Sequence, residues 1–158
     1  MDLIERIKIL RNHLGAKNFK KVIEGSTKLL KKFPKNHYIL NLVGMAYQGY
    51  SKHEYSIQYF REALKYAPNN IAIMNNYANS LKGLGKLEIS KELYEKILKK
   101  TPNIPATSRV GILFSLASAY QGNNKIEDTK KTIDEVFLID PSHSAAHKLM
   151  SSIIKYKL

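Results

Sequence analysis

The stretch GLGK, which runs from Gly83 to Lys86, has the residue types of a phosphate-binding loop. Such a loop holds phosphate oxygens with backbone N–H groups of its glycines and with a lysine ammonium group. Here Ser80 stands where the earlier glycine is needed, and Leu87 follows the lysine in place of serine or threonine. The stretch also falls between two helical patterns rather than after a strand. We therefore expect no phosphate binding at this loop.

The histidines and carboxylates also fail to form a chemical site. His143 and His147 are four residues apart and can share a helical face, but the sequence places no third metal ligand near them. The acidic pairs Glu127–Asp128 and Asp134–Glu135 are adjacent, so their side chains diverge on a helix, whereas general acid–base catalysis needs groups that converge. The chain has no cysteine, which removes thiolate chemistry. The sequence therefore predicts no enzyme activity, no cofactor and no metal.

Glycines and prolines that recur at a fixed period mark the elements carrying these residues. The period is 34 residues, and the last member of each series comes five residues late. The glycines are Gly15, Gly49, Gly83 and Gly122, and the prolines are Pro34, Pro68, Pro102 and Pro141. Each glycine follows an amphipathic stretch, which it can end with a positive φ. Each proline follows a second such stretch, which it cannot continue. Each unit is predicted to be helix, glycine turn, helix, proline turn.

Apolar residues inside the units recur at the helical period rather than alternating. In the second unit Leu40, Val43 and Tyr47 fall on one face of the first predicted helix, and Phe60 and Leu64 fall on one face of the second. Two amphipathic helices joined by a tight turn can bury these faces against each other. The sequence therefore predicts an all-α protein built of helical hairpins.

The second unit, NLVGMAYQGYSKHEYSIQYFREALKYAPNN, resembles a tetratricopeptide repeat (TPR), a helix–turn–helix unit of 34 residues. The residues that carry the resemblance are Gly44, Tyr47, Ser56, Phe60, Ala63 and Pro68. The third unit matches through Ala78, Leu81, Ser90, Tyr94 and Pro102. The first unit is the poorest match, because large residues occupy small-residue positions at Leu10, Val22 and Leu29. The repeats are also similar to those that precede bacterial O-GlcNAc-transferase-like or sulfotransferase domains.

This resemblance implies a right-handed α-solenoid of about four TPR units plus a C-terminal capping helix. A single TPR domain is expected over residues 1–158, with units at about 3–36, 37–70, 71–104 and 110–143 and a final helix at 144–158. The extra residues near Pro105 to Arg109 are expected to lengthen either the loop or the first helix of the fourth unit. The final helix also fits the first helix of a fifth unit that continues beyond the sequence.

In the TPR family the first helix of each unit lines a concave groove, and the resemblance implies which side chains face it here. The cations Lys8 and Arg11 come from the first unit. The other expected groove residues are Tyr38, Asn41, Met45, Gln48, Asn75, Asn76, Asn79, Lys82, Phe114, Ser115, Ser118 and Gln121. Amide side chains both donate and accept hydrogen bonds, so a row of them can pair with the main chain of an extended peptide. The alternative is that the asparagines serve packing between repeats.

The net charge of +13 is the unusual bulk property of the chain. It does not favour nucleic acid, because nearly all the cations are lysines scattered along the chain, whereas base and phosphate readout favours arginine. No apolar run is long enough to span a membrane. The N-terminus lacks the apolar core of a signal peptide. We interpret the protein as soluble and cytoplasmic.

Three functions remain open at this point. The first is a scaffold that binds a peptide or protein segment in its groove. The second is a substrate-recognition arm, itself not catalytic, of a larger glycosyltransferase or sulfotransferase, which the resemblance suggests. The third is RNA binding by a helical repeat, which a mostly neutral groove does not favour. Self-association also stays open, because the ends of a short solenoid can accept a helix of another copy.

Overall fold

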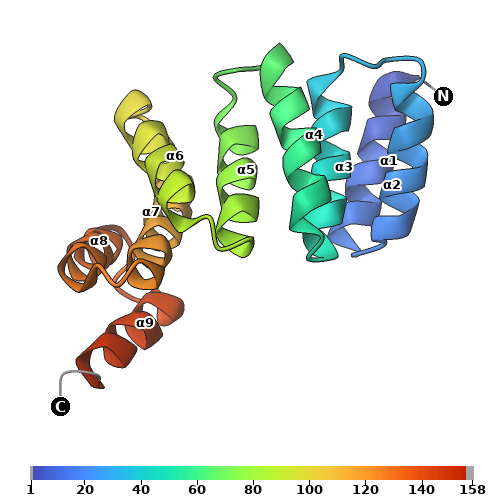
Figure 1. The fold of residues 1–158 in the computed structure, drawn as a ribbon. Coiled ribbons are helices and arrows are strands. Elements are labelled where there is room, and N and C mark those ends of the chain that lie inside the picture. Colours follow the sequence, from blue (N-terminus) through green and yellow to red (C-terminus); the bar gives the residue numbers. More distant parts are fainter. Residues whose placement is uncertain (1, 156–158) are drawn as a thin grey trace. The chain divides into compact units, whose positions relative to one another are not determined.

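The computed structural model describes residues 2–155, and this part of the chain forms α-helices joined by short turns, without a strand (Figure 1). The chain divides into two compact units, Met1–Leu84 and Gly85–Leu158. The helices of unit 1 are α1 (Leu3–Gly15), α2 (Phe19–Leu30), α3 (His37–Gly49), α4 (His53–Tyr66) and α5 (Ile71–Gly83). Those of unit 2 are α6 (Leu87–Lys100), α7 (Ala106–Gly122), α8 (Ile126–Ile139) and α9 (Ser144–Lys155). The single domain over residues 1–158 stays a prediction.

The helix boundaries agree with the predicted repeat. Each of the four predicted glycines ends a helix, and each of the four predicted prolines lies in the turn after the next helix. The extra residues lengthen a helix rather than a loop, since α7 has 17 residues where α1, α3 and α5 have 13. The predicted final helix begins at Ser144 and runs through Lys155, and its last three predicted residues lie outside the described part.

Asparagines start the first helices of the second and third repeats. The side-chain oxygen of Asn36 accepts hydrogen bonds from the N–H groups of Tyr38 and Ile39, and that of Asn70 accepts one from Ile73. These bonds satisfy N–H groups that have no partner inside the helix. The two caps lie one period apart, so the repeat also fixes where α3 and α5 begin.

In hairpin α3–α4 of unit 1, one large side chain packs against a residue that has none. Phe60 of α4 is fully buried, and a Cβ added to Gly44 of α3 would come within 2.5 Å of its ring. In hairpin α1–α2 the volumes are exchanged. Leu10 of α1 is the large residue, and Gly25 of α2 leaves it room. Complementary volume of this kind keeps the helix pair close-packed.

Three of the four glycines that end these helices serve packing, and none of the four has the positive φ that we expected. The positive φ angles occur two residues later, at Lys17, Ser51, Gly85 and Asn124. Instead, Gly49 leaves room for the ring of Phe19, because a Cβ there would come within 2.3 Å of it. Gly83 does the same for His53. In both cases the first residue of one repeat's second helix packs against the last residue of the next repeat's first helix.

The core of unit 2 joins hairpin α7–α8 to the last helix. Its buried residues include Leu113 and Ala117 of α7 and Ile133 of α8. Ala146 and Ile153 of α9 are buried in the same cluster. Helix α9 therefore covers the apolar side of the hairpin before it, as predicted for the final helix.

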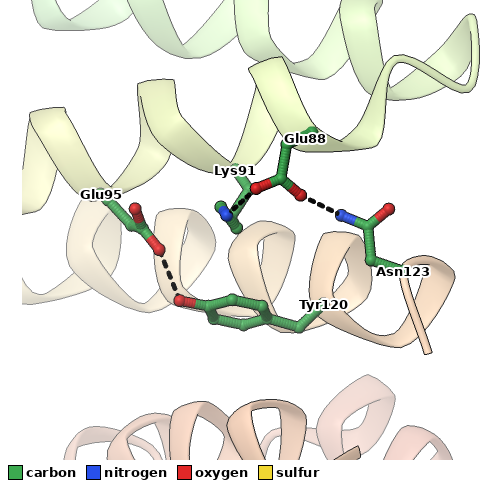
Figure 2. A network of polar contacts seen from close by, with 5 residues as sticks. All are labelled: Glu88, Lys91, Glu95, Tyr120 and Asn123. Carbon is green, nitrogen blue, oxygen red and sulfur yellow. Dashed lines mark hydrogen bonds and ion pairs between the residues drawn. The ribbon is translucent and has the colours of Figure 1, made fainter. Parts of the chain in front are cut away.

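A polar network connects α6 to α7 at the edge of this unit (Figure 2). The Tyr120 hydroxyl donates to a Glu95 oxygen at 2.5 Å, and the Asn123 amide donates to Glu88 at 3.0 Å. Lys91 forms an ion pair with Glu88, and its hydrogen bond lowers the pKa of that carboxyl group. Burial, together with Glu95, raises the pKa of the Tyr120 hydroxyl. The network holds two helices of unit 2 together along a partly solvated surface.

We predict opposite effects from the same substitution at two glycines that are one period apart. Gly49→Ala is expected to destabilise the chain by about 1–3 kcal/mol, because the added methyl group overlaps the ring of Phe19. Gly15→Ala has nothing within 4 Å of the added atom, so it should stabilise by up to about 1 kcal/mol through helix propensity. Urea unfolding followed by circular dichroism measures both. Equal effects at the two positions would contradict packing as the role of Gly49.

We predict that Tyr120→Phe lowers the free energy of unfolding by about 1 kcal/mol at neutral pH. The matched control is Tyr66→Phe, because Tyr66 donates to Glu62 at 3.1 Å on the exposed side of α4, and the loss of this bond should cost clearly less than the loss at Tyr120. Since the pKa of Tyr120 is raised in the folded state, its contribution is fully present below the ordinary value of 10.0 and is lost as the pH rises further. The difference between the native chain and Tyr120→Phe should therefore shrink above that pH. A difference that grows in alkali would contradict the network of Figure 2.

Candidate functional site

The expected groove residues of unit 1 lie on three helices that follow one another in space. Helix α3 contacts both α1 and α5, so the first helices of successive repeats are neighbours. Lys8 and Arg11, one helical turn apart on α1, are both exposed. Tyr38, at the start of α3, is the most exposed of the aromatic groove residues, at 61%. We call the expected groove residues of unit 1, taken together, the amide row. Its remaining members are half-buried, and they are Asn41, Met45, Gln48, Asn75, Asn76, Asn79 and Lys82.

Two of the predicted asparagines meet each other between repeats. The side-chain amide of Asn76 on α5 donates to the side-chain oxygen of Asn41 on α3 at 3.2 Å. The amide of Asn41 in turn lies 3.4 Å from the sulfur of Met45. Both asparagines are half-buried. This pair thus makes a contact between repeats, of the kind that the alternative interpretation of the sequence expects. Each amide has more donors and acceptors than this pairing uses, so both keep capacity for a ligand.

Gln48 makes hydrogen bonds between repeats that the sequence does not predict. Its side-chain nitrogen donates to the backbone oxygen of Asn76 at 3.1 Å and to the hydroxyl oxygen of Ser80 at 2.9 Å. The hydroxyl of Ser56 on α4 lies 2.8 Å from that of Ser80. Both serines are fully buried. Sequence reasoning missed Ser80, although a serine on the apolar side of a helix is a signal that a polar partner is near.

The α5 end of the row contains two polar groups in low-dielectric surroundings. The side-chain oxygen of Asn75 is buried and has no hydrogen-bond partner within the described residues. Burial lowers the pKa of the Lys82 ammonium group. Asn79, one turn before Lys82, is half-buried. A buried acceptor without a donor is costly to the folded state.

The four predicted residues of unit 2 are used mainly for local contacts. The Ser118 hydroxyl donates to the backbone oxygen of Phe114 in the preceding turn at 2.9 Å. The Gln121 amide lies 3.4 Å from the Ser152 hydroxyl of α9, and the ring of Phe114 is 5.0 Å from that of His143. Ser115 forms a hydrogen bond with Tyr94, which opposes the rise that burial causes in the pKa of that tyrosine. These side chains therefore contribute to contacts within unit 2.

The histidines that the sequence analysis set aside contact neighbouring residues of the chain. Within residues 2–155 no three side chains of histidine, cysteine, aspartate or glutamate come together as metal ligands would. His143 instead accepts from the N–H of Ala146, and His147 lies 2.8 Å from the backbone oxygen of Pro141. None of the helices in the described part has both the length and the apolar character needed to cross a bilayer.

The comparison with family models identifies the repeat family. A family model described as Psidin, N-terminal TPR repeats region, matches residues 5–136. A structure titled as the functional characterization of Pseudomonas aeruginosa PilF has a TM-score of 0.84 and 14% identity, and the match covers 97% of this chain and 68% of that one. None of the curated proteins matches the sequence.

Two further solved structures have similar folds. MamA from Desulfovibrio magneticus RS-1 has a TM-score of 0.82 and 15% identity, with coverage of 96% of this chain and 85% of that one. The kinesin light chain TPR-like repeats of Podosopora anserina have a TM-score of 0.75 and 12% identity, with coverage of 98% and 94%. Identities this low show the fold alone. Because the family model spans well over half of the residues, the chain belongs to the TPR family described as the N-terminal TPR repeats region of Psidin.

Proposed function

We propose that this chain is a scaffold without catalytic activity, whose unit 1 binds an extended peptide segment of a partner protein. The observation that carries the proposal is the amide row that crosses repeats, with Asn41 and Asn76 paired at 3.2 Å and both half-buried. The hydrogen bond from Asn76 to Asn41 holds the two side chains in place before a ligand arrives. Groups that are already ordered lose less conformational entropy on binding.

The chemistry of the row favours the main chain of the partner over particular side chains. An amide donates and accepts at once, so it can pair with both the C=O and the N–H of an extended peptide. Neighbouring helices lie about 8–10 Å apart, so α1, α3 and α5 extend over roughly 20 Å, or about six extended residues. Lys8 and Arg11 at the α1 end add affinity for an acidic residue or a terminal carboxylate.

The test uses the full chain as bait, with four alanine substitutions in the row: Arg11→Ala, Asn75→Ala, Asn76→Ala and Asn79→Ala. Proteins retained from a native lysate are identified by mass spectrometry, and the affinity of the retained partner is then measured by calorimetry. Each hydrogen bond is worth about 0.5–1.5 kcal/mol, so affinity should fall by at least about 30-fold. The helical circular dichroism should persist.

The matched control removes one arginine and three asparagines that are exposed outside the row: Arg61→Ala, Asn12→Ala, Asn69→Ala and Asn103→Ala. It changes the net charge by the same amount, so it accounts for general electrostatic attraction. Its affinity for the partner should stay within about twofold of the native chain. If the row variant binds the partner as tightly as this control does, the amide row is not the binding site.

A further inference from the structure

A pocket of about 280 Å³ opens between α1 and α2, the two helices of the first hairpin. Its apolar lining comes from Ile9, Leu10, Gly25 and Leu29. Ile9 is 39% exposed. An apolar cavity of roughly 150 Å³ is large enough to take up benzene. The pocket can therefore accommodate an aromatic side chain.

The second hairpin shows what is missing from the first. One period after Gly25 and Ser26 come Tyr59 and Phe60, which pack against α3 from α4. Val43, one period after Ile9, is fully buried there. The first hairpin has the same helices but lacks both aromatic rings. The pocket thus lies where the second hairpin supplies a ring of its own.

Three cations surround this apolar floor. Arg6 lies at the α1 side, and Lys28 and Lys32 are one turn apart at the α2 side. None of the three forms an ion pair with another residue in the range 2–155. The hairpin as a whole is strongly basic, because residues 2–36 contain ten lysines and arginines against three acidic residues, a net charge of +7. The rim therefore attracts negative charge, and cations beside an aromatic ring bind its face.

The pocket is separate from the amide row. On α1, Arg6 and Ile9 are one turn apart on one face, whereas Lys8 and Arg11 are one turn apart on the opposite face. A ligand in the pocket leaves the row of unit 1 open. The two sites can therefore be tested independently.

We infer that the α1–α2 pocket binds an aromatic side chain, phenylalanine or tyrosine, presented by an acidic segment of a partner protein. The ring occupies the space that Tyr59 fills in the next hairpin, and the flanking carboxylates pair with Arg6, Lys28 and Lys32. The aromatic ring of the partner thus fills a space that the side chains of the α1–α2 hairpin leave empty. This inference does not depend on the function proposed for the amide row.

The first experiment measures binding of two short capped peptides to the full, isotope-labelled chain by nuclear magnetic resonance. One peptide has aspartates and glutamates around a central phenylalanine, and the other has alanine at the centre. The phenylalanine peptide should bind at least about tenfold tighter, with shifts at the amides of Ile9, Gly25 and Leu29. Equal affinities, or shifts confined to α3 and α5, would overturn the inference.

Charge variants separate the rim from general attraction. Arg6→Gln with Lys28→Gln and Lys32→Gln should weaken the phenylalanine peptide by about tenfold or more. The matched control is Lys20→Gln with Lys21→Gln and Lys31→Gln, three exposed lysines of the same hairpin outside the pocket, and it should change affinity by less than about threefold. If both variants weaken peptide binding equally, only the net charge of the hairpin matters, and a specific binding site at the pocket is contradicted.

Filling the pocket from within gives an independent readout. Leu10→Ala with Gly25→Tyr places a ring where the second hairpin has one and makes room for its Cβ, which would otherwise meet the end of Leu10 at 2.6 Å. This variant should keep its helical circular dichroism and lose the preference for the phenylalanine peptide. If this variant does not fold, the charge variants still test whether the pocket binds the phenylalanine peptide. In a contrary outcome, the protein sediments with phosphatidylglycerol vesicles in a way that depends on the same three cations, without binding the peptide. That result would show that the pocket binds membranes and would overturn the inference.

Discussion

Close packing between neighbouring helices, with a large side chain on one helix against a small residue on the other, is the constraint on which this fold depends. A pair of short helices in a repeat has no other way to bury its apolar faces than to approach closely, and close approach requires that a large residue on one helix meets a small one on the other. Phe60 and Gly44 satisfy this requirement in one hairpin, and Leu10 and Gly25 satisfy it with the roles reversed in another. The same requirement acts between repeats, where Gly49 receives the ring of Phe19.

The sequence was sufficient to predict the helices, because both of its signals are local. The period of glycines and prolines marks the ends of helices, and the spacing of apolar residues marks their buried faces. The insertion before the fourth repeat could be located from the delay of Gly122 and Pro141, but not assigned to loop or helix. It lengthens α7, because Ala106 to Arg109 can continue a helix that starts after Pro105.

Contacts between side chains were predicted less well, for a physical reason. Spacing places Asn41 and Asn76 on corresponding faces of two helices, but it does not say that their amides bond to each other or that Gln48 reaches Ser80. The glycines illustrate the same limit. A glycine at a helix end fits a positive φ and fits close packing equally well, and only the position of Phe19 distinguishes the two at Gly49. That this row holds a peptide remains a proposal.

The division of the chain after Leu84 falls inside the third repeat, not between repeats. Helix α5 therefore belongs to one compact unit and α6 to the other, although the two are consecutive in a single sequence repeat. Repeat boundaries drawn from sequence therefore do not coincide with the boundary between the compact units. A shortened protein that ends after Leu84 would keep α5 with α4, the helix that it packs against, whereas one that ends at the repeat boundary after Asn70 would lose α5.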